Sequence, residues 1–191
     1  MTCDDVAVVP IIRTARLELV SFSLGAMRAT LDHDLATVAT ELDAEVPGDL
    51  VDALGGLFQL RIAQLEADPT GVPWLARAIV VSGEDGVRRL VGSIGFHQPP
   101  VDGVVEIGYN VEPAYRRGGI ATEAVRAMLD WAAEQGIHSI RASVQPANAA
   151  SLGVIARFGF QQTGVQWDDV DGEELVFMTT WPAPEAPAHG S

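Results

Sequence analysis

The sequence predicts a mixed α/β fold in a single domain, and three observations lead to that prediction. Strand-like stretches recur at short intervals, helical patterns precede and follow them, and turn residues separate them. A chain of 191 residues with 48% hydrophobic content can bury one sizeable core. We therefore expect one domain over residues 13–181, with a flexible segment at 1–12 and a disordered tail at 182–191.

The first part of the domain is expected to contain one strand and two helical segments. Residues 16–21 alternate charged and apolar side chains, as a half-buried strand does, and this strand is expected to open the sheet. Residues 24–42 carry apolar side chains at steps of three and four, and residues 50–65 repeat them on one helical face. Pro47-Gly48-Asp49 separates the two segments, and Asp49 is the expected N-cap of the second.

Three further strands predict an antiparallel meander. They occupy residues 74–81, 90–97 and 104–111. The connections at 83–86 and 98–103 are rich in Gly, Pro and Asp, which favour tight turns.

The last third of the domain adds a β-α-β-α segment, counted from the strand at 104–111, and a C-terminal hairpin. Gly136 stands where a helix C-terminal cap is expected. The predicted elements are a helix at residues 120–135, a strand at 139–144, a helix starting near Asn148, and hairpin strands at 160–165 and 174–181.

Composition excludes several classes of function. The net charge is −14, and an acidic surface does not neutralise the phosphates of nucleic acid. Cys3 is the only cysteine, so no disulfide forms within the chain, and the four histidines lack ligand spacing, so we expect no metal site. The N-terminus is acidic rather than signal-like, and no apolar run is long enough to cross a membrane. We therefore expect a cytoplasmic protein.

The most informative segment is Arg116-Arg117-Gly118-Gly119-Ile120-Ala121, between the strand at 104–111 and the helix at 120–135. Two glycines let the backbone turn tightly, and the helix N-terminus adds a partial positive charge. This arrangement is typical of a pyrophosphate-binding loop. An ordinary strand-to-helix turn explains the same residues equally well.

The order of the elements resembles the GNAT superfamily of acetyl-CoA-dependent N-acetyltransferases. The segments that carry the resemblance are EIGYNVEP (106–113), RRGGIATEAVRAML (116–129) and PANAASLGVIARFGF (146–160). Within the superfamily the chain is most similar to the RimJ/RimL-like branch of ribosomal-protein N-terminal acetyltransferases. The resemblance implies a GNAT-like fold. It also implies acetyl transfer from acetyl-CoA to a primary amine, a protein N-terminal α-amine or a small molecule, by direct attack in a ternary complex.

The resemblance also implies which residues bind acetyl-CoA. The backbone N–H groups from Arg117 to Thr122 bind its pyrophosphate, and Asn110 and Val111 offer the backbone donor that polarises the thioester carbonyl. Asn148 steadies the pantetheine arm, and it is equally suited to cap a helix. The implied cofactor-binding residues are Asn110, Val111, Arg116, Arg117, Gly118, Gly119, Ile120, Ala121, Thr122 and Asn148.

Two side chains are the candidate catalytic groups. An ammonium group must lose a proton before it attacks a thioester, so a base is needed. The resemblance implies Glu106 as the candidate base, because it lies on the strand that leads to the glycine loop, at a spacing similar to that of the glutamate used by several superfamily members. A solvated strand glutamate and a water relay to another carboxylate are the alternatives. Ser151 is the candidate proton donor to the departing sulfur, or a first-turn hydroxyl that satisfies the backbone. Many members of the superfamily carry a tyrosine acid four positions before the Gly-Phe pair, where this chain has Ile155.

Acidic residues suggest a cationic amine as the acceptor. One acidic group follows Trp167, and a second lies near the helical segments. Each group is also compatible with an ordinary solvated loop. Trp167 itself is a candidate wall of the acceptor site or an exposed hairpin aromatic. The acidic residues of the two groups are Asp168, Asp169, Asp171, Glu173 and Glu174, and Glu41, Asp43 and Glu45. The alternative function is a non-catalytic acyl-CoA-binding sensor or interaction module, and a homodimer is the commonest assembly for such a chain.

Overall fold

The structure, a computed structural model, describes residues 9–170 and 172–182. The expected flexible segment at 1–12 and the tail at 182–191 therefore lie largely outside the described residues. Residues 9–12 are exceptions: Pro10 O accepts a hydrogen bond from Arg77 at 3.0 Å, and Ile12 belongs to a short strand and pairs with Leu19. Paired structure thus begins within the segment that was expected to be flexible.

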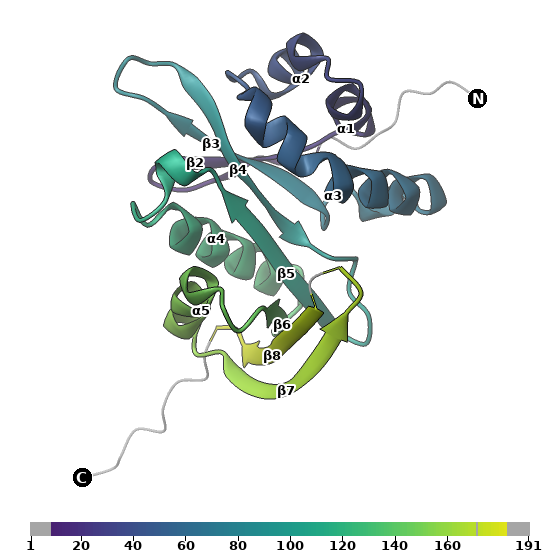
Figure 1. Ribbon diagram of the computed structural model, residues 1–191, viewed down its shortest axis with the longest axis vertical. Coiled ribbons are helices and arrows are strands. Elements are labelled where there is room, and N and C mark those ends of the chain that lie inside the picture. Colours follow the sequence, from purple (N-terminus) through teal and green to yellow (C-terminus); the bar gives the residue numbers. More distant parts are fainter. Residues whose placement is uncertain (1–8, 171, 183–191) are drawn as a thin grey trace.

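The described part of the chain forms one sheet of eight strands, in the order β1-β2-β3-β4-β5-β6-β8-β7 (Figure 1). All neighbouring strands pair antiparallel except β5 and β6, which pair parallel. The mixed α/β fold, the antiparallel meander and the C-terminal hairpin are therefore confirmed. The strands are β1 (Ile12–Arg13), β2 (Leu17–Ser21), β3 (Ala76–Ser82), β4 (Arg88–Phe96), β5 (Val104–Val111), β6 (Ser139–Val144), β7 (Gln161–Asp168) and β8 (Gly172–Thr180).

Helices cover both faces of the sheet (Figure 1). On strand β3, Ala78 and Val80 pack into a core with the first three helices, whereas Ile79 packs on the other face with α4. Both faces of β3 are buried, so its sequence is apolar with little alternation. The helices are α1 (Leu24–Leu31), α2 (Leu35–Leu42), α3 (Gly48–Ala67), α4 (Ile120–Glu134) and α5 (Ala149–Ile155), with short 3-10 turns at Pro69–Gly71, Pro113–Tyr115 and Ala156–Phe158.

The N-terminal elements differ from the sequence prediction in three ways. The helical segment expected at 24–42 is two helices, because the chain turns through His33 in the left-handed region (φ 55°) and Asp34 then caps α2. Asp49 lies inside the first turn of α3, which begins after Pro47 without a side-chain cap. The strand expected to open the sheet is β2, and β1 pairs along its outer side.

The elements around the candidate site agree closely with the prediction. Strands β5 and β6 have the expected bounds, and α4 begins at Ile120 as expected. Gly136 follows the end of α4 with a φ of 81°, as its expected role as a C-terminal cap requires. Among the described residues, no helix combines the length and the apolar character that crossing a bilayer demands.

Candidate active site

The central feature of the site is an opening between β5 and β6. The two strands pair over only three positions, from Val104 with Ser139 to Glu106 with Arg141. Both strands continue past that point, β5 to Val111 and β6 to Val144. Within residues 9–170 and 172–182, the last five residues of β5 thus have no partner strand on their β6 side, and β5 runs on past β6 in Figure 1.

Backbone donors of β5 point into this opening. His97 N–H donates to Glu106 O at 2.8 Å and Glu112 N–H donates to Val91 O at 2.8 Å, so the even-numbered residues bond to β4. In a strand the backbone groups alternate in direction, so the N–H groups of Tyr109 and Val111 point toward β6. Of the two candidate donors to a thioester carbonyl, the geometry therefore favours Val111, because the Asn110 backbone faces β4. Sequence patterns did not identify Tyr109, because only the pairing register reveals its direction.

A tight loop closes the far end of the opening. Arg116 donates from Nε to Val111 O at 2.7 Å, and Arg117 has a φ of 65°. Gly119 has a φ of 82°, a conformation that glycine adopts without a steric cost, and it precedes α4 with no side-chain cap. The first N–H groups of a helix lack intrahelical partners. Those of Ile120, Ala121 and Thr122 are thus available to an anion, in the way that the sequence predicts.

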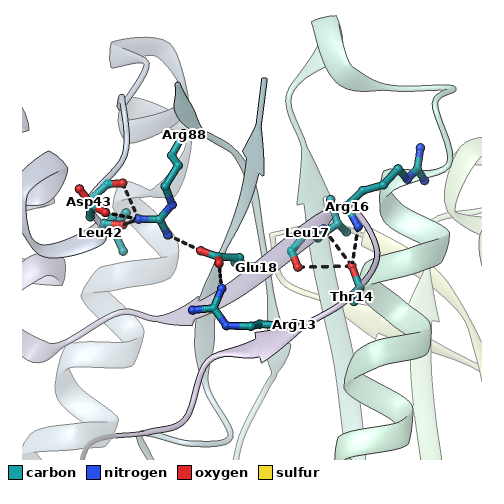
Figure 2. A network of polar contacts seen from close by, with 8 residues as sticks. All are labelled: Arg13, Thr14, Arg16, Leu17, Glu18, Leu42, Asp43 and Arg88. Atoms are coloured by element: carbon teal, nitrogen blue, oxygen red, sulfur yellow. Dashed lines mark hydrogen bonds and ion pairs between the residues drawn. The ribbon is translucent and has the colours of Figure 1, made fainter. Parts of the chain in front are cut away.

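Strand β2 and the segment before it brace this loop from the opposite side. Arg16 donates to Gly118 O at 2.9 Å and, through Nε, to Glu123 Oε2 at 2.7 Å. Thr14 donates to Glu123 Oε1 at 2.6 Å, and it also bonds to the backbone of Arg16 and Leu17 (Figure 2). Burial raises the pKa of Glu123, but the hydrogen bonds from Thr14 and Arg16 outweigh it, and the net pKa lies below the ordinary value. The brace fixes the loop before any ligand arrives.

The first turn of helix α5 contacts β5 beside the opening, through Tyr109. Asn148 caps this helix, because its side chain accepts a hydrogen bond from Ser151 N–H at 3.1 Å. The Tyr109 hydroxyl donates to Ser151 O at 3.4 Å, so the tyrosine ring spans from β5 to α5. Burial raises the pKa of Tyr109. Ile155 is 1% exposed and packs in the core, so the position of the usual tyrosine acid holds a structural residue.

A polar cluster lies on the face of the sheet opposite α4, beside the point where β5 and β6 part. Glu106 lies 3.7 Å from His97 Nδ1 and 3.3 Å from Arg141 Nε. Arg141 also donates to Gln166, and Gln166 donates to Glu174 Oε2 at 2.8 Å. Glu106 is therefore the centre of a charged network rather than a solvated strand residue.

Three members of this network were not identified from the sequence. His97 was interpreted as an ordinary histidine without ligand spacing, and Arg141 and Gln166 lie on strands far away in the chain. A polar residue at a buried strand end was the only local signal for His97. The cross-strand contact with Glu106 becomes visible once the β4–β5 register is known.

The acidic groups divide between the site and the remote surface. Glu174 belongs to the polar cluster, Trp167 is 75% exposed on β7, and Asp171 lies outside the described residues. Arg88 binds Asp43 and Glu18 at the other end of β4 (Figure 2). Glu45 and Glu41 are likewise engaged, with Arg89 at 3.2 Å and with Ser23. Asp43 and Glu45 are thus paired with arginines and Glu41 accepts a hydrogen bond from Ser23, and none of these contacts involves the cluster around Glu106.

Two surface grooves lie beside residues 10–18. One, of about 620 Å³, is lined by residues 10–15 and by α4; the other, of about 610 Å³, is lined by residues 13–18, the β3–β4 turn, Tyr115 and Ile120, and so borders the start of α4. Neither contains Glu106, Val111 or Ser151 among its lining residues. We place the candidate active site at the β5–β6 opening, because the charged cluster lies at its start and the unpaired backbone donors of β5 follow along the same strand.

Comparison with known proteins identifies the family. Residues 30–161 match the model of the acetyltransferase (GNAT) domain. A probable N-acetyltransferase, YjcK, from Bacillus subtilis is 37% identical over 81 residues, which are 40% of this chain and 44% of that protein. An L-methionine sulfoximine/L-methionine sulfone acetyltransferase from Pseudomonas paraeruginosa is 34% identical over 62 residues, 32% of this chain and 36% of that protein. The chain thus matches less than half the length of these curated relatives.

The fold is shared with solved structures. A putative ribosomal-protein-serine acetyltransferase from Vibrio cholerae superposes with a TM-score of 0.61 at 16% identity, over 94% of this chain and 99% of that one. At such an identity the likeness concerns the fold alone. The family model, by contrast, covers more than half of this sequence, including β5, the glycine loop and α5. The chain therefore belongs to the GNAT family of acetyltransferases, whose members use acetyl-CoA as the acetyl donor.

Proposed function

We propose that this protein transfers the acetyl group of acetyl-CoA to a primary amine by direct attack in a ternary complex. The single observation that carries this proposal is the parting of β5 from β6 next to a loop that leads into a helix N-terminus. An extended arm with amide groups can pair with the free edge of β5 as an additional strand would. The pyrophosphate attached to that arm then meets the N–H groups of residues 117–122, and Arg116 and Arg117 add positive charge.

The chemistry follows from the groups that line the opening. The Val111 N–H, with Tyr109 N–H beside it, stabilises the oxyanion that forms when the amine attacks the thioester carbonyl. A preorganised donor of this kind typically contributes about 3 kcal/mol to lowering the barrier. On the acceptor side, the carboxylate of Glu106 favours removal of the proton from the amine, because its negative charge stabilises the positive charge that the proton carries. Ser151, at the first turn of α5, or a water molecule protonates the departing thiolate.

The acceptor class is the finer part of the proposal. An α-amino group has an unperturbed pKa of about 8, against about 10.4 for a lysine side chain, so it needs less help to lose its proton at neutral pH. The RimJ/RimL-like branch, which this chain resembles, acts on such amines in ribosomal proteins, and the fold is shared with a putative ribosomal-protein-serine acetyltransferase from Vibrio cholerae. The similarity of this chain to an L-methionine sulfoximine/L-methionine sulfone acetyltransferase favours the α-amine of a free amino acid as the acceptor. Both acceptors present an α-amine, and we propose that this group is the substrate.

Calorimetric titration with acetyl-CoA and with CoA tests the donor site directly. Wild-type protein is expected to bind both at micromolar concentration. Gly119→Glu, which places a side chain and a negative charge in the loop, should abolish binding. Thermal unfolding of the variant reports whether it is folded. Absence of binding to the wild type would contradict the proposal.

Turnover is measured as release of CoA and as acetylated product by mass spectrometry. The acceptors are a peptide with an N-terminal serine, L-methionine sulfone, spermidine, and an N-terminally blocked peptide containing lysine. We expect acetylation of the first or second in preference to the others. Tight binding of acetyl-CoA with no turnover of any of these amines would instead favour the non-catalytic acyl-CoA-binding function.

A further inference from the structure

His97 occupies the path between Glu106 and the opening. It follows the last residue of β4 and lies opposite Glu106 on β5. Its ring extends along β5 over Gly108, so that an added Cβ at Gly108 would stand 2.8 Å from His97 Nε2 and 3.2 Å from Cδ2. The glycine therefore makes room for the imidazole. The ring nitrogen Nδ1 faces Glu106, and Nε2 lies two positions nearer to the free end of β5.

The position of His97 is fixed by its surroundings. Its backbone N–H donates to Glu106 O at 2.8 Å. Its carbonyl oxygen accepts hydrogen bonds from Arg61 and, at 3.0 Å, from Gln64 Nε2, both on α3. Arg61 is 5% exposed and keeps this contact inside the protein. Helix α3 and strand β5 together hold the backbone of His97 from both sides.

Distance along the strand separates the roles of the two side chains. Tyr109 and Val111, whose N–H groups face the opening, follow Glu106 by three and five positions, about 10 and 16 Å at about 3.3 Å per residue. A glutamate side chain does not span that distance to an amine held beside those donors. The imidazole over Gly108 covers the first part of it.

We propose that His97 Nε2 accepts the proton of the attacking amine, and that Glu106 orients and stabilises the imidazole through Nδ1. This inference rests on the proposed acetyl transfer. In the step, the amine nitrogen forms the C–N bond, and its proton passes to Nε2, directly or through one water. The C–S bond then breaks and the thiolate takes a proton from Ser151 or from water. The imidazolium returns its proton to solvent, which reaches the ring because half of the His97 side chain is exposed.

The charges around the ring suit a neutral base. Partial burial lowers the pKa of His97 below its ordinary value; Glu106 and Glu174 counteract this effect, and Arg61 and Arg141 reinforce it. The imidazole is therefore neutral at pH 7, with a lone pair available once Nδ1 carries the hydrogen. Glu106 lies close enough to stabilise the cation after the proton arrives.

Gly108 provides a test that moves the imidazole without removing it. Gly108→Ala displaces the far end of a flexible side chain, so the fold is retained. His97→Gln removes the base. Gly164→Ala on β7 is the matched control, because none of the residues that the structure describes lies within 4 Å of an added Cβ there. We measure kcat/KM against pH for each variant with acetyl-CoA and the better of the serine peptide and L-methionine sulfone.

The proposal predicts a non-additive pattern. His97→Gln should lower kcat/KM by about 100-fold or more and remove the acidic limb of the pH profile. Gly108→Ala should lower it by about tenfold, and the double variant should match His97→Gln alone. Gly164→Ala should match the wild type. Wild-type activity with an unchanged pH profile in His97→Gln would overturn the proposal, and so would additive losses in the double variant.

A second measurement separates this inference from the proposed function. The pKa of His97 is read from the chemical shift of its ring carbon by NMR, without any acceptor. Glu106→Gln should lower that pKa, because the carboxylate favours the imidazolium. An unchanged pKa would show that the two groups do not act together, whatever amine is acetylated. Failure to bind acetyl-CoA, with a shifted pKa, would instead contradict the proposed function alone.

Discussion

Substitution of Gly119 by alanine tests the glycine loop, because a second glycine with nearly the same φ angle, Gly136, follows the other end of α4. Gly119 has a φ of 82° and Gly136 a φ of 81°. A Cβ in the left-handed region costs about 1 kcal/mol, so both variants should lose about that much stability. At Gly119 the added Cβ also stands 3.3 Å from Arg16 Nη2, whereas at Gly136 it meets none of the described residues within 4 Å. For a chain of this size, the loss lowers Tm by about 2–4 °C. Only Gly119 belongs to the proposed phosphate site.

The two variants should therefore differ in binding. Relief of the strain at Gly119 turns at least one N–H group away from the pyrophosphate, and a hydrogen bond to a charged group contributes about 1.5–3 kcal/mol. The Kd for acetyl-CoA should rise by about 10- to 150-fold in Gly119→Ala and stay unchanged in Gly136→Ala. Thermal unfolding and calorimetric titration measure the two quantities. Equal affinity in wild type and Gly119→Ala would refute the assignment of the loop, and an equal loss in both variants would mean that the effect comes from stability.

Three further predictions follow from individual contacts. Asn148→Ala should lower stability by about 1 kcal/mol through loss of the α5 cap. Asn148→Asp should restore stability but not acetyl-CoA affinity. Wild-type affinity in Asn148→Asp would exclude a contact between the Asn148 amide and the pantetheine arm. The pKa of His97 is lower in the folded protein than in the unfolded chain, so on acidification the unfolded chain takes up the proton at a higher pH. The stability present above about pH 6.5 is therefore lost as the pH falls through the folded pKa. The free energy of unfolding of His97→Gln should therefore fall less between pH 7 and 5 than that of the wild type. Denaturant titrations at several pH values measure this, and an equal fall in the two proteins would contradict it. Phe58→Ala, at a fully buried site against Phe22, should cost about 3–5 kcal/mol yet leave acetyl-CoA affinity intact in the folded protein, which calorimetry checks.

The sequence was sufficient for the elements that carry strong local patterns. Strands β5 and β6 were predicted to the residue, because each is bounded by turn residues and enriched in β-branched side chains. The glycine loop was predicted from Gly118 and Gly119 before a helical pattern, and the structure places both glycines at the expected turn. Asn148 was predicted as a cap, and its side chain makes that hydrogen bond.

Features that depend on contacts between distant segments could not be predicted. The brace of Arg16 on Gly118 joins residues 102 positions apart, and no local pattern marks it. The break between α1 and α2 contains neither Gly nor Pro and depends on the cap by Asp34. The relation of His97 to Glu106 requires the β4–β5 register, which periodicity within a single strand does not specify.

The most direct test is an NMR titration of the ¹⁵N-labelled protein with acetyl-CoA, which shows which backbone amide signals move. Occupation of the β5–β6 opening should shift the amides of Tyr109 and Val111, of residues 117–122 and of residues 142–144. The surface grooves beside residues 10–18 are the alternative locations on the described surface. Shifts concentrated there, with Val111 and Gly119 unmoved, would contradict the placement of the active site at the opening.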